Sequence, residues 1–191
     1  MQRFITLAFS TLLLLSLNAA TPETHYTVIV SLDGFRWDYP DMYKTPNLDR
    51  MAADGVKAVM LPSYPASTFP NHYTLATGLV PDHHGIINNT FWDVKNRRQY
   101  SMGDSATRNN PEYYLGEPIW ITAQKQGIKT GNMYWVGSDI AIKKSHPTYY
   151  RPWNAKPFLT FEQRIDTVLT WLQKPEPERP RLIMLYIEEP D

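Results

Sequence analysis

Cysteine is absent from the 191 residues, which excludes disulfide bonds, a cysteine nucleophile, thiolate metal sites and lipid anchors attached to cysteine. Net charge is absent as well, because 19 Lys and Arg balance 19 Asp and Glu. A nucleic-acid polymer is therefore not expected as a partner, since counterion-driven binding needs a basic surface. The chain also lacks an apolar run of the roughly 20 residues that a membrane-spanning helix requires.

The first twenty residues have the features of a secretory signal peptide. Arg3 gives a short basic start, residues 4–17 are apolar apart from four Thr and Ser, and Asn18-Ala19-Ala20 offers small residues for cleavage. We expect residues 1–20 to be removed and the mature protein to be exported, periplasmic or secreted, with no stable membrane anchor after cleavage. An uncleaved anchor is the alternative.

Segments typical of strands and helices alternate along the rest of the chain. Four apolar, β-branched runs are candidate strands: residues 26–32, 56–61, 128–135 and 182–187. Four segments with helical spacing or helix start and stop signals lie between them: residues 46–54, 68–77, 118–126 and 161–172. Residues 88–110 and 145–157 are expected to be irregular. The alternation predicts an α/β fold, with a mostly parallel sheet flanked by helices.

Two acids follow candidate strands. Asp33 comes directly after residues 26–32, and Asp191 comes shortly after residues 182–187. Because ligands of such sheets bind beyond the carboxyl ends of the strands, the two carboxylates are expected to meet at one edge. Carboxylates there are suitable ligands for zinc or magnesium. An Asp-Gly turn is an equally simple explanation for Asp33.

Thr68 stands at the expected start of a helix, where free backbone N–H groups and the helix dipole favour an anion. A threonine hydroxyl activated by a metal could attack phosphorus at that place. A purely structural role as helix cap is the alternative.

Several other polar residues have competing interpretations. His83 and His84, in the segment Asp82-His83-His84-Gly85, are expected to be structural, because neighbouring side chains in an extended turn point apart. His72 is expected to be a hydrogen-bonded packing histidine. Asn89, within Asn88-Asn89-Thr90, offers an amide donor for a phosphate oxygen, although this string is also a glycosylation sequon and a turn signal.

Six strings of residues, in order and at compatible spacing, resemble the nucleotide pyrophosphatase/phosphodiesterase family of the alkaline phosphatase superfamily. They occupy residues 30–36, 65–73, 77–86, 116–120, 135–139 and 185–191. The resemblance spans nearly everything after the signal peptide. It implies an alkaline-phosphatase-like central sheet, and it assigns residues 21–191 to the amino-terminal part of a phosphodiesterase catalytic domain.

The resemblance also implies a two-zinc site that cleaves small-molecule nucleotide phosphodiesters. Asp33 and Thr68 would bind one zinc and Asp191 the other, with Thr68 as the nucleophile of a phosphothreonine intermediate. Asn89 would contact a non-bridging phosphate oxygen. The nucleobase slot would have Phe69 on one side and Trp153, in place of the tyrosine of relatives, on the other, with Tyr186 lining the same pocket.

The resemblance places the remaining zinc ligands beyond Asp191, so we expect this chain to be a fragment that is incomplete at its C-terminus and inactive alone. A phosphate monoesterase of the same superfamily is the first alternative, but the basic pair expected near Ser138 is missing. A phospholipid or choline phosphodiesterase and a catalytically silent phosphate-binding relic remain open. A sulfatase is disfavoured, because a threonine stands at the nucleophile position and cysteine is absent.

Overall fold

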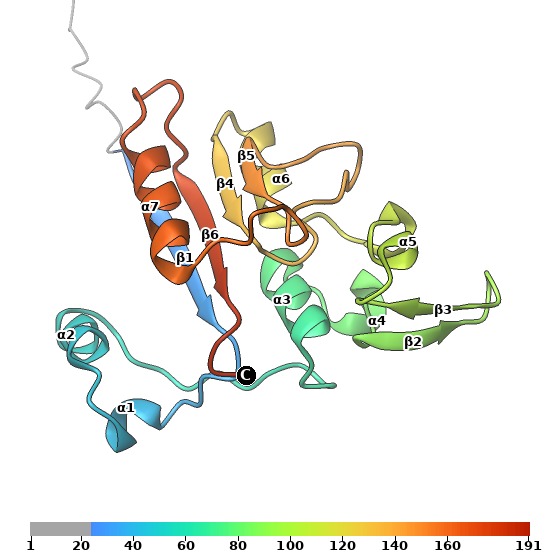
Figure 1. Ribbon diagram of the computed structural model, residues 1–191, viewed down its shortest axis with the longest axis horizontal. Coiled ribbons are helices and arrows are strands. Elements are labelled where there is room, and N and C mark those ends of the chain that lie inside the picture. The colour runs from blue at the N-terminus through green and yellow to red at the C-terminus, as the bar shows by residue number, and fades with distance from the viewer. Residues whose placement is uncertain (1–23) are drawn as a thin grey trace, which may run out of the picture.

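A computed structural model describes residues 24–191, so the predicted signal peptide over residues 1–20 lies outside the described residues. At its centre is a parallel sheet with strand order β1-β6-β4-β5 (Figure 1). Its strands are β1 (Thr27–Leu32), β4 (Thr130–Met133), β5 (Tyr149–Arg151) and β6 (Leu182–Ile187). All of β6 is buried, as expected for an inner strand of a parallel sheet.

Helices and a separate hairpin surround this sheet. The hairpin pairs β2 (Thr90–Asp93) with antiparallel β3 (Arg98–Ser101). The helices are α1 (Tyr39–Met42), α2 (Pro46–Asp54), α3 (Thr68–Thr77), α4 (Pro81–His84), α5 (Ser105–Arg108), α6 (Ile119–Lys125) and α7 (Phe161–Leu172), with a 3-10 turn at Pro111–Tyr113. No helix within residues 24–191 combines the length and apolar character needed to cross a membrane.

Two helices contact β4 on its opposite faces. Gly131 faces the Trp171 ring of α7, whereas the hydroxyl of the preceding Thr130 donates a hydrogen bond to Gln124 of α6. Successive strand residues point to opposite faces, so α6 and α7 cover the sheet from its two sides. α3 packs against α6 and thereby joins the same layer (Figure 1).

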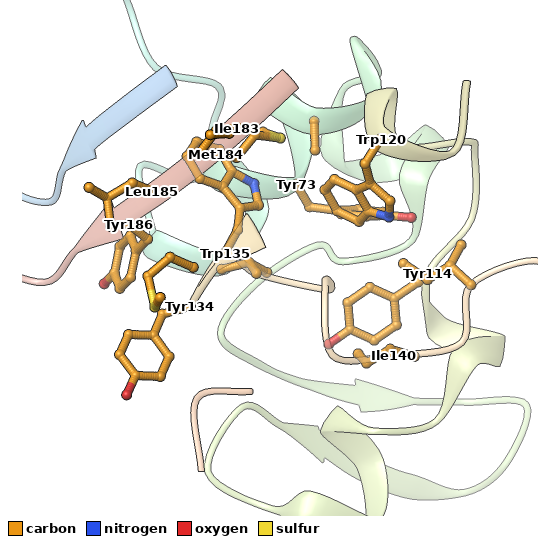
Figure 2. Close-up of a cluster of buried hydrophobic side chains, with 14 of the residues drawn as sticks. Tyr73, Tyr114, Trp120, Tyr134, Trp135, Ile140, Ile183, Met184, Leu185 and Tyr186 are labelled. Atoms are coloured by element: carbon orange, nitrogen blue, oxygen red, sulfur yellow. The ribbon is translucent and has the colours of Figure 1, made fainter. Parts of the chain in front are cut away.

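The core between these layers is rich in aromatic side chains. Tyr73 of α3, Trp120 of α6 and Trp135 after β4 are almost fully buried and gather beside the inward residues of β6 (Figure 2). Large rings bury much apolar area, and Trp135 thereby attaches the loop after β4 to the core. Part of the site described below is built on that loop.

Most predicted elements are confirmed. α7 and β6 have the predicted bounds, and the helices over residues 46–54 and 68–77 are also present. The strand predicted over residues 128–135 is shorter, because the chain turns away at Tyr134, where φ is +56°.

Three predictions are wrong. Residues 56–61 form no strand, because no described strand pairs with them, and their apolar side chains are exposed. Residues 88–110 are not irregular, since the hairpin β2–β3 and α5 occupy them and Phe91 stacks on Tyr100 across the strands. The loop over residues 145–157 contains the edge strand β5, which pairs with β4.

Candidate active site

The ends of β1 and β6 bring the two predicted acids together. The strands pair in parallel with Leu32 opposite Ile187, and the Asp33 N–H donates to the Ile187 carbonyl at 2.9 Å. Gly34 then turns with φ +66° directly against Asp191, so close that a Cβ on Gly34 would lie 2.7 Å from the Asp191 Cα. Asp33 and Asp191 therefore belong to one corner, although 157 residues separate them in sequence.

Tyr186 orients the carboxylate of Asp33. Its hydroxyl donates to Asp33 Oδ2 at 2.7 Å, while the Gly34 N–H donates to Asp33 Oδ1 at 3.1 Å. Burial, together with the neighbouring Asp33, raises the pKa of Tyr186 above its usual value, so the phenol keeps its proton. Tyr186 thus contacts the carboxylate corner, in addition to lining the aromatic cavity as the resemblance predicted.

Thr68 is the first residue of α3, and Ser67 occupies the N-cap position. The interpretation of Thr68 as the cap is therefore wrong, and its hydroxyl is not committed to capping. The preceding loop is held in place by Asn71, whose side-chain amide accepts from the Ser63 N–H at 2.7 Å and donates to the Pro65 and Ser67 carbonyls. The role of Asn71 was not predicted from the sequence, although an amide side chain one turn into a helix is a usable signal.

Asn89 reaches the same helix start from the loop before β2. Its Oδ1 accepts a hydrogen bond from the Phe69 N–H at 2.9 Å. This bond occupies the amide oxygen and leaves the NH₂ group as the donor that is available to a ligand beside Thr68. The orientation follows from the hydrogen-bond network, because oxygen and nitrogen of an amide are otherwise interchangeable.

Two cavities meet at Thr68 and Asp191. The first, of about 550 Å³ and called the polar cavity below, is also lined by Asp33, His72 and Asn89. The second, of about 260 Å³ and called the aromatic cavity below, has six aromatic side chains among its lining residues. A ligand with a charged group and a flat apolar group could occupy both.

The three residues predicted for the nucleobase slot line the aromatic cavity. These are Phe69, Trp153 and Tyr186, and the Trp153 ring lies 5.7 Å from that of Tyr186. Sequence analysis missed two charged residues of this cavity, Arg108 of α5 and Asp139. Burial raises the pKa of Asp139, and the charge of Arg108 opposes that rise.

Two of the three histidines predicted to be structural, His72 and His84, are engaged in hydrogen bonds, whereas the His83 side chain is 69% exposed and lies in α4 rather than in an extended turn. His72 Nε2 lies 2.9 Å from Ser31 Oγ, and its Nδ1 lies 2.8 Å from the Thr68 carbonyl. His84 accepts from the Ile86 N–H at Nδ1, which places its proton on Nε2, toward the Pro70 carbonyl. Burial lowers the pKa of both rings.

The donor set at the corner fits the oxygen side of a divalent metal site. Asp33, Asp191 and Thr68 line the same cavity, and hard oxygen donors such as carboxylates and hydroxyls bind zinc and magnesium. Within residues 24–191, no cluster of three or more His, Asp and Glu side chains is arranged to hold an ion. Asp33, Asp191 and Thr68 are oxygen donors of the kind that such a site would use.

Comparison with known proteins gives the family of this chain. Residues 27–191 match the model of the family described as type I phosphodiesterase / nucleotide pyrophosphatase. The chain belongs to this family. The predicted family and the predicted alkaline-phosphatase-like α/β fold are therefore both confirmed.

Family members with curated descriptions are similar to most of this chain. It is 43% identical to ectonucleotide pyrophosphatase/phosphodiesterase family member 3 of Bos taurus over 86% of its length, and 45% identical to member 1 of Homo sapiens over 88%. It is 42% identical to venom phosphodiesterase 2 of Crotalus adamanteus over 86%. The chain spans only 19%, 18% and 20% of these three relatives, respectively.

A solved relative has the same fold and a described ligand. Murine ectonucleotide pyrophosphatase / phosphodiesterase 5, in an inactive variant in complex with AMP, superposes with a TM-score of 0.79 at 35% identity. The match covers 87% of this chain and 44% of that chain.

Proposed function

We propose that this chain carries the nucleophile and the nucleotide-binding half of a zinc-dependent phosphodiesterase that cleaves phosphodiester and pyrophosphate bonds of nucleotides. The observation that carries the proposal is the meeting of the two cavities at Thr68. The polar cavity is lined by Thr68 with its hydroxyl, by Asn89 with its free NH₂ group, and by the acids Asp33 and Asp191. The aromatic cavity shares Thr68 with it. Family membership and the AMP complex of the murine relative support the same substrate class.

Each residue has a distinct task in this reaction. The base stacks between Phe69 and Trp153, which sets the 5′-phosphate beside Thr68. Thr68 Oγ attacks the phosphorus, a new O–P bond forms, the bond to the leaving oxygen breaks, and the nucleoside phosphate is held as an ester of Thr68. Attack by water then breaks the Thr68 O–P bond and releases a nucleoside monophosphate. Asn89 donates its NH₂ group to a non-bridging phosphate oxygen as charge develops there.

Asp33 and Thr68 would hold one zinc ion and Asp191 a second, in each case together with ligands of the complete enzyme. When bound, zinc supplies positive charge against the phosphate oxygens and makes oxygen nucleophiles available at neutral pH. This dependence of turnover on a full ligand set is also why we expect residues 1–191 to be inactive without further ligands. The proposal includes export, in line with the extracellular relatives that the names ectonucleotide pyrophosphatase and venom phosphodiesterase describe.

A diester substrate is favoured over a monoester by the charge of the polar cavity. Within the described part of the chain, no Lys or Arg lines that cavity, and Lys143 is paired with Glu117 at 3.5 Å. A doubly charged monoester would need such cations, whereas a diester carries one charge less.

The test compares Thr68→Ala with wild type and with Thr167→Ala, a control that removes a helical hydroxyl far from the cavities. The complete enzyme that contains this chain is purified with zinc, here and in the kinetic measurements below, and is given the p-nitrophenyl ester of thymidine 5′-monophosphate and, separately, p-nitrophenyl phosphate. We expect wild type and control to prefer the diester and Thr68→Ala to lose at least about 10³-fold in kcat while it still binds AMP. Wild-type preference for the monoester, or substantial turnover by Thr68→Ala, contradicts the proposal. If no protein form turns over, a ratio of one zinc or none per AMP-binding chain supports a silent relic instead.

A further inference from the structure

Arg164 is a charged residue in the interior that the proposed reaction does not use. It lies on the inner face of α7, its side chain is 1% exposed, and it lines neither cavity. Burial of an unpaired guanidinium costs several kcal/mol, so a charge at such a position has to be compensated by its surroundings. The residues that compensate the charge of Arg164 connect it to the carboxylate corner and to the aromatic cavity.

The polar partners of Arg164 all belong to the segments that build the site. Its guanidinium forms a two-point ion pair with Glu188, in which Nη1 donates to Oε2 and Nη2 donates to Oε1 at 2.8 Å. Nη1 also lies 3.4 Å from the Tyr186 carbonyl, and Nε donates to the Leu159 carbonyl at 3.1 Å. Four of the five N–H donors of an arginine are thus engaged.

Glu188 connects Arg164 to the carboxylate corner. It stands two residues after Tyr186, whose hydroxyl orients Asp33, and its carbonyl accepts from the Asp191 N–H at 3.3 Å. The Arg164–Glu188 pair therefore fixes the short segment after β6 that places Asp191 beside Asp33.

The faces of the guanidinium connect Arg164 to the aromatic cavity. Its central carbon lies 4.7 Å from the Tyr134 ring centre and 4.9 Å from that of Phe158, two rings that stack on each other. Trp153 stands edge-on against both rings, with centroids 5.5 Å and 5.0 Å away. Tyr134 is held in its left-handed conformation by this contact and by the Leu159 N–H, which donates to its hydroxyl at 3.0 Å. Arg164 supports the wall on which Trp153 rests.

We propose that Arg164 is a positioning residue that holds the Tyr186–Asp191 segment and the Trp153 wall in one fixed relation, so that phosphate and base are presented to Thr68 together. The inference rests on the proposed function, because that function defines which groups are presented to Thr68. The contacts by which Arg164 holds the two segments do not depend on it. A lysine cannot replace Arg164, because a single ammonium lacks the planar fork for Glu188 and the flat face for Tyr134.

The first experiment measures this positioning without any activity. Amide hydrogen exchange is followed in wild type, in Arg164→Lys and in Arg98→Lys, whose exposed arginine pairs with Asp104 at 3.8 Å and serves as control. In Arg164→Lys we expect exchange to rise at least about tenfold at residues 153–159 and 186–191, while the C-terminal half of α7 keeps its protection. Unchanged exchange in both segments, or an equal rise throughout α7 and β6, overturns the proposal.

The second experiment separates positioning from stability. Replacement of a buried ion pair by apolar side chains often restores stability, so Arg164→Met combined with Glu188→Met should recover most of the urea midpoint that Arg164→Met alone loses. We still expect this double variant to have at least about tenfold lower kcat for the nucleotide ester and for bis(p-nitrophenyl) phosphate, with KM raised only for the nucleotide ester, which alone uses the aromatic wall. Wild-type kinetics in the double variant overturn the proposal. If wild type hydrolyses neither ester, the proposed function fails, and the exchange result alone decides the role of Arg164.

Discussion

The closeness of Gly34 to Asp191 predicts that one added methyl group will disable the site while it barely changes the fold. Alanine at position 34 would meet two separate obstacles. The backbone there has φ +66°, which costs a residue with a Cβ about 1 kcal/mol or slightly more. The new Cβ would also lie 2.7 Å from the Asp191 Cα, so the Asp191 backbone has to retreat by about 0.7 Å to reach the 3.4 Å of an ordinary contact.

Gly78 provides a matched control, because it ends α3 with φ +69° and has no neighbouring atom within 4 Å of the place that a Cβ would take. Gly34→Ala and Gly78→Ala should therefore share the conformational cost, and only Gly34→Ala should displace Asp191 from Asp33. A misplacement of about 1 Å at a reacting centre lowers turnover by up to about 100-fold.

The assay pairs urea unfolding with kcat/KM for the p-nitrophenyl ester of thymidine 5′-monophosphate. We expect both alanine variants to lose about 1 kcal/mol of unfolding free energy, and Gly34→Ala alone to lose between about 10-fold and 100-fold in kcat/KM. Equal turnover of the two variants would refute the reasoning, because the displacement of Asp191 would then have no chemical consequence.

Three further predictions concern single contacts. Asn89→Asp keeps the acceptor for the backbone of α3 but replaces the free NH₂ donor by an anion, so kcat/KM should fall at least about 100-fold with an unchanged melting temperature. Burial lowers the pKa of His84 in the folded protein, so the unfolded chain protonates this histidine at a higher pH than the folded chain does. The stability contributed by the neutral ring is therefore full above about pH 6.5 and declines below it. The urea midpoint of His84→Gln should decline less between pH 7 and pH 5 than that of wild type. Gly131→Ala places a Cβ 2.7 Å from the Trp171 ring and should cost about 1–3 kcal/mol in urea unfolding, whereas Gly103→Ala, with only a side-chain oxygen at 3.6 Å, should be nearly neutral.

Local patterns were sufficient where neighbours in sequence decide the structure. The helical spacing of residues 161–172 and the apolar run 182–187 predicted α7 and β6 with their bounds, and the strand-end position of Asp33 and Asp191 predicted that they meet. The rule about strand ends works for these acids because it depends only on the direction of the strands.

Pairing between distant segments could not be predicted in this way. Residues 56–61 have the composition of a strand, but composition does not provide a partner, and the segment stays outside the sheet. Arg164 illustrates the same limit at the site. Its position on α7 does not indicate that it faces inward, and this becomes clear only from its contacts with Glu188 and Tyr134. Sequence patterns cannot reveal a charge compensated by residues from three separate segments.

The strand order has a consequence for how the chain folds. Among the strands of residues 24–191, β6 lies between β1 and β4, so the sheet around β1 cannot form before residues 182–187 are available. At a synthesis rate of about 5–20 residues per second, β1 waits roughly 8–30 s for its neighbour. Among the described strands, the hairpin β2–β3 and the pair β4–β5 can assemble earlier. Both acids of the corner therefore come together only when β6 pairs with β1, and a polypeptide interrupted before that step has a threonine at a helix start but no carboxylate corner beside it.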